Sequence, residues 1–158
     1  RRQRQMCIRD RGRPVRMPVI VIAVVYGLAW TTMSYMRGGD PLAFPWQRPI
    51  MMAIGLVLAF AEEIAVRGLI LDRLARCGTS RIIQIVVTAG IMAVYHGVVG
   101  HSVWPSYMVS SFVLFGVLSV IYVYGGRSLT PVYIAHAMAH FLGDPALMQG
   151  VLYGVGAG

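Results

Sequence analysis

Six ionisable side chains interrupt stretches of this 158-residue chain that are otherwise apolar: Glu62, Glu63, Arg67, His96, His136 and His140. A charged side chain inside a membrane span costs roughly 2.5 to 3.5 kcal/mol on insertion scales, so such residues need a partner or a function. Carboxylates beside imidazoles suit the hydrolysis of an amide. A carboxylate can take a proton from water, and imidazole N–H groups can donate to the oxyanion of the attacked carbonyl.

The spacing of these residues predicts how they meet. Glu63 and Arg67 are four apart, so they share a helix face and can form an ion pair that either fixes the helix or supports a site. Glu62 points about 100° away and needs a partner on another helix. His136 and His140, in the run HAMAH, are also four apart and stack their rings on one face. We expect one assembled site.

The expected site residues also suit a zinc ion. Zinc binds His and Glu side chains and lowers the pKa of a bound water to about 7. The run HAMAH has the two-histidine spacing of H-E-x-x-H but lacks the glutamate of that motif. We favour a metal-free hydrolysis that requires no cofactor. A zinc shell of Glu62, His96, His136 and His140 stays open as the alternative.

The elements that must position these residues are apolar stretches separated by charged or turn residues. They cover residues 18–36, 50–71, 82–99, 107–124 and 131–143, followed by a last stretch to residue 158. Each of the first four is long enough to cross a membrane as a helix. The fifth is either a short or re-entrant helix or one half of an interrupted span. The sequence predicts an all-α polytopic transmembrane bundle of about five to six membrane helices around a buried polar site.

Composition excludes several other classes of protein. The chain is 57% hydrophobic and only 13% charged, and residues 17–36 and 82–126 contain no Asp, Glu, Lys or Arg. Soluble domains are about one quarter charged, so a soluble, disordered or nucleic-acid-binding protein is excluded. The net charge of +8 comes largely from the first sixteen residues. The two cysteines are too few and too far apart for a disulfide framework, so we expect free thiols.

The arginines predict an orientation. Residues 1–16 hold seven, the connection after residue 71 holds three and the connection after residue 124 holds one, against Arg37 and Arg48 on the opposite side. Positive residues concentrate on the cytoplasmic side, so we expect a multi-pass plasma-membrane protein with its N-terminus in the cytoplasm. Residues 1–16 form an Arg-rich tail and 17–158 a single transmembrane domain. We expect the sequence to be incomplete at one or both ends, and the absence of lysine favours a bacterial source.

Three ordered motifs carry a resemblance to a known family. Residues 62–67 read EExxxR, His96 follows on the next span, and His136 is followed four residues later by His140. This set resembles the CAAX-processing and bacteriocin-processing family of intramembrane proteases, also called CPBP or Abi, whose motifs are EExxxR, FxxxH and HxxxN or HxxxD. The resemblance covers residues 50–143. Met92 stands where the family has Phe, and His140 stands where it has Asn or Asp.

The resemblance implies roles for the six residues. Glu62 with His96 would activate the water, His136 and His140 would hold the oxyanion, and Glu63 with Arg67 would support the site. The implied function is an intramembrane endopeptidase that cuts a membrane-associated protein or peptide within the lipid bilayer, with roles in CAAX-type processing, bacteriocin processing or self-immunity. The rival hypothesis is a non-proteolytic immunity protein or transporter-like subunit that uses the same cluster as an ion or proton site.

Overall fold

Helices make up the described part of the chain, which in the computed structural model comprises residues 16–36, 48–99 and 104–141. They are α2 (Met17–Met36), α3 (Arg48–Glu63), the π-helical segment η1 (Ile64–Leu71), α4 (Asp72–Arg76), α5 (Arg81–Val99), α6 (Trp104–Tyr124) and α7 (Leu129–Phe141). The described residues contain no strand. Nearly all of the predicted tail, the loop at 37–47 and the stretch after residue 141 lie outside the described residues.

The second predicted span is one continuous helix made of three parts. It runs through α3, η1 and α4, so only the hydrogen-bonding pattern changes along its length. It ends at Arg76, and Gly78 in the following turn has a φ of +78°, a left-handed conformation that glycine adopts without steric cost. The amide of Thr79 donates to the Leu74 carbonyl at 3.2 Å, which closes the last turn. Ser80 then accepts from the amide of Ile83 at the start of α5, at 3.3 Å.

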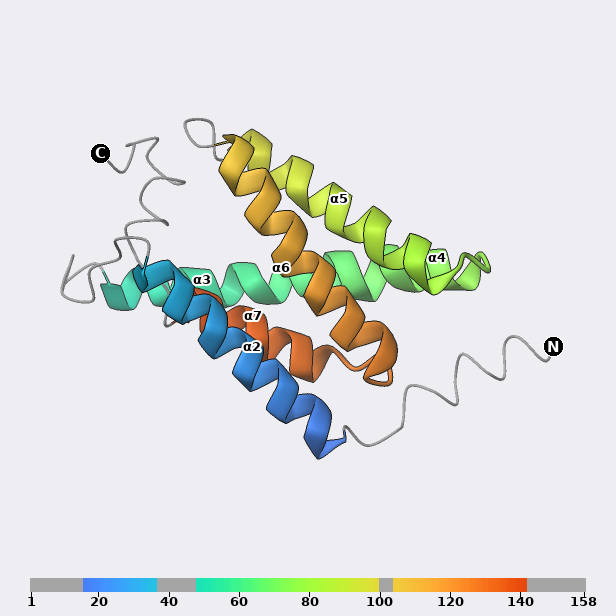
Figure 1. Cartoon of the computed structure of the whole chain (residues 1–158), viewed down its shortest axis with the longest axis horizontal. Helices are drawn as coiled ribbons and strands as arrows, with labels where there is room; N and C mark the ends of the chain where they lie inside the picture. The colour runs from blue at the N-terminus through green and yellow to red at the C-terminus, as the bar shows by residue number, and fades with distance from the viewer. Residues whose placement is uncertain (1–15, 37–47, 100–103, 142–158) are drawn as a thin grey trace.

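The helices pack as neighbouring pairs around α6. α5 lies along α6, α7 lies along both α2 and α3, and α6 also contacts α7 (Figure 1). Figure 1 shows α6 crossing diagonally over α3, with the start of α2 and the α4–α5 and α6–α7 turns toward the same end of the bundle. Phe115 and Leu118 of α6 are fully buried. The core therefore follows the middle of α6.

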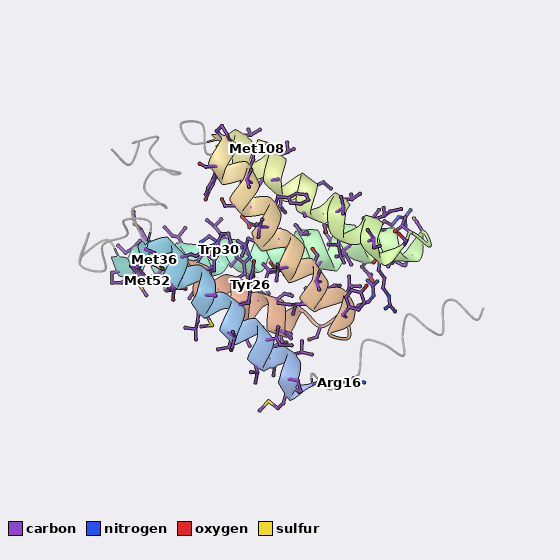
Figure 2. All side chains as sticks on the ribbon, viewed as in Figure 1. Arg16, Tyr26, Trp30, Met36, Met52 and Met108 are labelled. Carbon is purple, nitrogen blue, oxygen red and sulfur yellow. The ribbon has the colours of Figure 1, made fainter. Side chains whose placement is uncertain are left out.

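The outer surface of the bundle is apolar, as a lipid-facing surface requires. Large hydrophobic side chains project outward along every long helix, among them Val21, Val57 and Val109 with 57%, 69% and 66% of their surface exposed. In Figure 2, Tyr26 and Trp30 lie one turn apart on α2, and the Tyr26 hydroxyl donates to the Leu114 carbonyl of α6 at 3.4 Å. This contact ties the outer helix α2 to the core.

Three helices of the described chain are long and apolar enough to cross a membrane, at residues 49–76, 81–98 and 105–124. The α-helical bundle was predicted, but this count is lower than the expected five to six. α2 is represented by a shorter apolar helix, Met17–Met33. α7 has 13 residues and is about 20 Å long at 1.5 Å per residue, less than the roughly 30 Å of a bilayer core. Over its described residues α7 is thus shorter than a bilayer core, and it packs against α2, α3 and α6.

Candidate active site

Glu63 and Arg67 belong to one buried strip of the second helix. The strip takes every fourth residue: Met51, Gly55, Ala59, Glu63, Arg67 and Leu71. An α-helix advances about 100° per residue, so a spacing of four drifts by about 40° at each step. The i→i+5 hydrogen bonds of η1 place more residues in each turn and reduce that drift. The π-helical segment therefore keeps Glu63, Arg67 and Leu71 in line toward the core.

Arg67 is fully buried and joins the second helix to α6. Its Nη1 donates to Glu63 Oε1 at 2.9 Å. Its Nη2 donates to the Phe115 carbonyl at 2.9 Å and to Ser119 Oγ at 3.5 Å, and its Cζ lies 5.0 Å from the centre of the Phe115 ring. Hydrogen bonds to a charged group are stronger than neutral ones, so this side chain fixes the position of the Glu63 carboxylate.

His136 lies between the two glutamates. Its Nδ1–H donates to Glu63 Oε1 at 2.9 Å, and its Nε2 is 3.7 Å from Glu62 Oε2. His136 and Glu63 each expose only 1% of their surface. Because the Nδ1–H bond to Glu63 sets the tautomer of the neutral ring, Nε2 carries the lone pair that faces the rest of the cluster. The Glu62 Oε2 atom is buried and has no hydrogen-bond partner among the described residues.

His140 stacks one turn after His136 on α7. The two Nε2 atoms are 3.1 Å apart, so His140 can donate its Nε2–H to the Nε2 lone pair of His136. Gly55 of α3 lets this part of α7 come close, because a Cβ atom at position 55 would lie 2.9 Å from the His140 Cβ. A larger residue at 55 would push α7 away from α3.

His96 on α5 is connected to the cluster by ring contacts through Phe115. Its Nδ1–H donates to the Met92 carbonyl at 2.8 Å, which leaves Nε2 as a free acceptor. Its ring centre is 5.2 Å from that of Phe115, which is in turn 5.0 Å from that of His136. Within the described residues, His96 and Glu62 are not in hydrogen-bond contact. The structure thus brings Glu62, Glu63, Arg67, His136 and His140 together directly and places His96 across one ring.

Sequence reasoning did not identify the contribution of α6. Phe115 is one of many apolar residues in that helix, and Ser119 is one of three serines within residues 107–124, so neither stands out by its type. The Ser119 hydroxyl lies 3.0 Å from that of Thr88 on α5, and Thr88 donates to the Gln84 carbonyl at 2.8 Å. All three residues are buried. A chain of polar groups therefore continues from Arg67 into the α5–α6 interface.

The positions of its donor atoms bear on whether the cluster could hold a zinc ion. His136 has Nε2 available, and His140 Nε2 is close to it. In the part of the chain that the structure describes, no three His, Cys, Asp or Glu side chains are grouped as a metal shell. A structural zinc has four ligands and a catalytic zinc three from the protein. The four side chains of the alternative zinc shell are thus not gathered as one group within the described residues.

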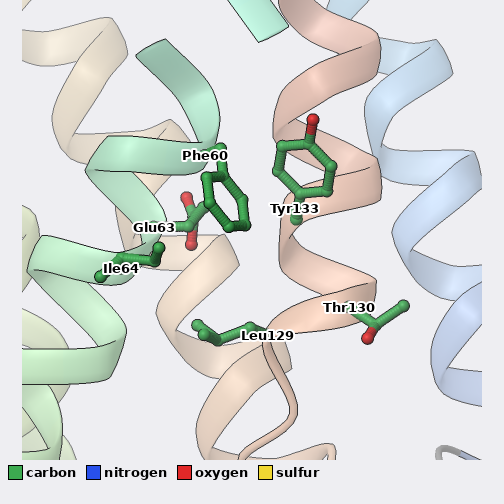
Figure 3. A pocket seen from close by; sticks show the side chains of 6 residues that line it. All are labelled: Phe60, Glu63, Ile64, Leu129, Thr130 and Tyr133. Atoms are coloured by element: carbon green, nitrogen blue, oxygen red, sulfur yellow. The ribbon is translucent and has the colours of Figure 1, made fainter. Parts of the chain in front are cut away.

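A small cavity of about 140 Å³ lies beside Glu63, between the second helix and α7 (Figure 3). Its lining consists of Phe60, Glu63, Ile64, Leu129, Thr130 and Tyr133. The walls are almost entirely apolar, and neither Glu62 nor any of the site histidines lines them. This cavity borders the supporting pair rather than the group of side chains around Glu62.

Comparison with known proteins gives one match. The model of the family described as "Type II CAAX prenyl endopeptidase Rce1-like" matches residues 44–142 of the 158, which include all six site residues. No curated protein and no solved structure matches the chain. Since the family match covers more than half of the sequence and the helices are those of a membrane protein, the chain belongs to the Rce1-like family of membrane-embedded CAAX-type endopeptidases.

Proposed function

We propose that the protein hydrolyses a peptide bond of a membrane-associated substrate with water activated by Glu62 and His96, without a metal ion. The observation that carries this proposal is the Glu62 Oε2 atom, which is buried, has no hydrogen-bond partner in the described chain and lies 3.7 Å from His136 Nε2. A carboxylate oxygen in such a place is available to accept a proton from water.

The reaction starts with the nucleophile. Glu62 accepts a proton from water while the water oxygen forms a bond to the peptide carbonyl carbon. His96 assists by orienting the same water through Nε2, since its Nδ1–H is already bonded to the Met92 carbonyl. A positioned base of this kind contributes about 10²- to 10⁴-fold in rate.

The carbonyl oxygen then becomes an oxyanion that needs donors. His140 turns its Nε2–H from His136 to that oxygen and donates to it. Glu62 passes the proton taken from water to His136 Nε2, 3.7 Å away, and this N–H also donates to the oxyanion before the proton returns to Glu62. Glu63 keeps the His136 ring oriented through Nδ1. When the tetrahedral intermediate collapses, the C–N bond breaks and Glu62 returns its proton to the leaving amine. The products are a free carboxyl group and a free amine, so all atoms and protons balance.

The substrate is a peptide anchored in or on the membrane. The family's printed name points to a prenylated CAAX C-terminus, whereas an all-arginine basic composition favours a bacterial source and a role in bacteriocin processing or self-immunity. Two substrates separate these roles: a prenylated CAAX peptide and a membrane-anchored peptide without a prenyl group. Both are offered to the protein in lipid vesicles, and mass spectrometry locates the cut.

The decisive variant is Glu62→Gln, which keeps the volume and removes the base. We expect the wild type to cut one of the two peptides and the variant to lose at least 100-fold in rate. Asp72→Asn makes the same carboxylate-to-amide change on the same helix, in a side chain that pairs with Arg76 outside the site, and should keep the wild-type rate. Proton flux into vesicles that carry the wild type, with neither peptide cut, would favour the rival transporter-like function.

A further inference from the structure

One aromatic ring of α6 lies at the centre of the site. Phe115 is fully buried and its ring contacts side chains from three other helices. The ring centre is 5.2 Å from that of His96 on α5, 5.0 Å from that of His136 on α7, and 5.0 Å from Arg67 Cζ in η1. The Phe115 ring therefore packs against both the His96 and the His136 imidazole.

The backbone of Phe115 is fixed as firmly as its ring. Its carbonyl oxygen accepts Arg67 Nη2 at 2.9 Å and Ser119 Oγ at 2.7 Å, both from buried side chains. Ser119 in turn is 3.0 Å from Thr88 on α5. The ring is thus attached to a part of α6 that is bonded to η1 and α5 at once, and it has little freedom to shift.

Both histidines need such a fixed neighbour. The χ2 torsion of histidine has broad preferences, so a single hydrogen bond through Nδ1 leaves the ring able to turn over when that bond breaks. For His96 the bond to the Met92 carbonyl sets the ring. For His136 the bond to Glu63 at Nδ1 sets it, together with the 3.1 Å contact of its Nε2 with His140 Nε2. A rigid ring packed against each imidazole removes the space into which it would turn.

We propose that Phe115 is a positioning residue for both imidazoles, holding His96 Nε2 and His136 Nε2 toward the same reacting group while separating the two rings. This inference rests on the proposed function for its effect on rate, but its effect on ring orientation stands independently of it. Phe115 touches neither water nor substrate in this role. It acts through the two histidines.

The test replaces the ring and keeps an apolar side chain. Phe115→Leu and Phe115→Met remove the flat, rigid surface, Met being the more adaptable filler if Leu fails to fold. Two controls accompany them. Phe112→Leu makes the same change one turn earlier at a side chain that is 42% exposed, and Leu118→Val trims a fully buried residue of the same helix. Each variant is measured for thermal unfolding, kcat and KM in vesicles.

We expect kcat of the Phe115 variants to fall by about 10- to 100-fold with KM within about twofold, as misplaced catalytic groups cause. Leu118→Val should lower thermal stability to a similar extent but keep kcat within about threefold. The second measurement is the ring ¹⁵N spectrum of His96 and His136, assigned with His96→Gln and His136→Gln. In the Phe115 variants the two Nδ1 signals should move toward values of a weaker hydrogen bond, while Phe112→Leu leaves them in place.

Each outcome decides the proposal. If the wild type cuts a peptide but the Phe115 variants lose no more kcat than Leu118→Val, and the ring signals do not move, Phe115 only fills the core and the proposal is overturned. If the wild type cuts neither peptide, the proposed function fails. The ring signals alone then decide: movement upon loss of Phe115 supports the positioning role, and unchanged signals reject it.

Discussion

Removal of Arg67 tests whether the buried ion pair organises the site. The guanidinium exposes 0% of its surface, and Glu63, its partner, exposes 1%. Arg67→Met deletes the donor to Glu63 Oε1 at 2.9 Å and the donor to the Phe115 carbonyl. A buried pair that loses one partner destabilises a protein by about 3–5 kcal/mol, because the remaining charge is uncompensated. His136 alone would then face the Glu63 carboxylate.

The expected magnitude sets a clear thermal signal. For a chain of this size about 1 kcal/mol corresponds to a shift of about 2–4 °C, so we expect the midpoint of Arg67→Met to fall by roughly 6–20 °C. The unfolding midpoint of Glu63→Gln should fall by a comparable amount. Glu63→Gln combined with Arg67→Met removes both charges and should recover most of the loss, since a neutral replacement of a buried pair is often close to neutral in stability.

The assay is thermal or denaturant unfolding of all four proteins in the same micelles, which closes a double-mutant cycle. Arg67→Lys serves as a further comparison, because lysine keeps the charge but cannot donate to Glu63 and to the Phe115 carbonyl in a forked geometry. We expect Arg67→Lys to recover less than half of the stability that Arg67→Met loses. Two single losses that simply add in the double variant, or a single loss below about 1 kcal/mol, would refute the reasoning.

Three further predictions concern other parts of the molecule. If His140 is an oxyanion donor, His140→Asn keeps a side-chain N–H and should cut the substrate at a comparable rate, whereas His140→Leu should lower that rate by about 10²- to 10³-fold. Stoichiometric zinc in the wild type that disappears together with activity in His140→Asn would instead establish a metal enzyme. Gly55→Val should lower kcat by about tenfold or more and destabilise the fold, because a Cβ at 55 would lie 2.9 Å from the His140 Cβ. Gly68→Val is its control, because a Cβ at 68 would only reach van der Waals contact with Ile64 Cγ2 at 3.9 Å. In a Cys7→Ser background, the exposed Cys77 should react with a membrane-impermeant thiol reagent only after permeabilisation, and labelling in intact cells would reverse the predicted orientation.

Local spacing made part of this arrangement predictable. Residues four apart on a helix meet, so the sequence suggested both the contact of Glu63 with Arg67 and the stacking of His136 on His140, and the structure contains both. Helix ends were also readable, because charged and turn residues bracket the apolar stretches. These features depend on a few residues that are near in sequence.

Contacts between distant segments were not predictable in the same way. The pattern of ionisable residues did not predict that His136 would form a hydrogen bond with Glu63, 73 residues away in the sequence. Nor did it predict that His136 Nε2 would lie 3.7 Å from Glu62 Oε2. It gave no reason to single out Phe115, since an apolar residue in an apolar span has no distinguishing type. The π-helical hydrogen bonds of η1 were equally hidden, because no residue type in Ile64–Leu71 distinguishes a π-helix from an α-helix.

The π-helical segment changes how the second helix presents itself to lipid. Ile50, Val57 and Phe60 of α3 are exposed at an α-helical rhythm, and Leu69 is exposed within η1. A helical wheel drawn at 3.6 residues per turn through residues 48–76 would therefore lose phase at Ile64, and residues beyond it would be assigned to the wrong side. A scan of spin labels for contact with lipid along this helix should show two periodic patterns that join out of phase across Ile64–Leu71. The boundary between those patterns marks the depth in the bilayer at which the hydrogen bonding of the second helix changes from α-helical to π-helical.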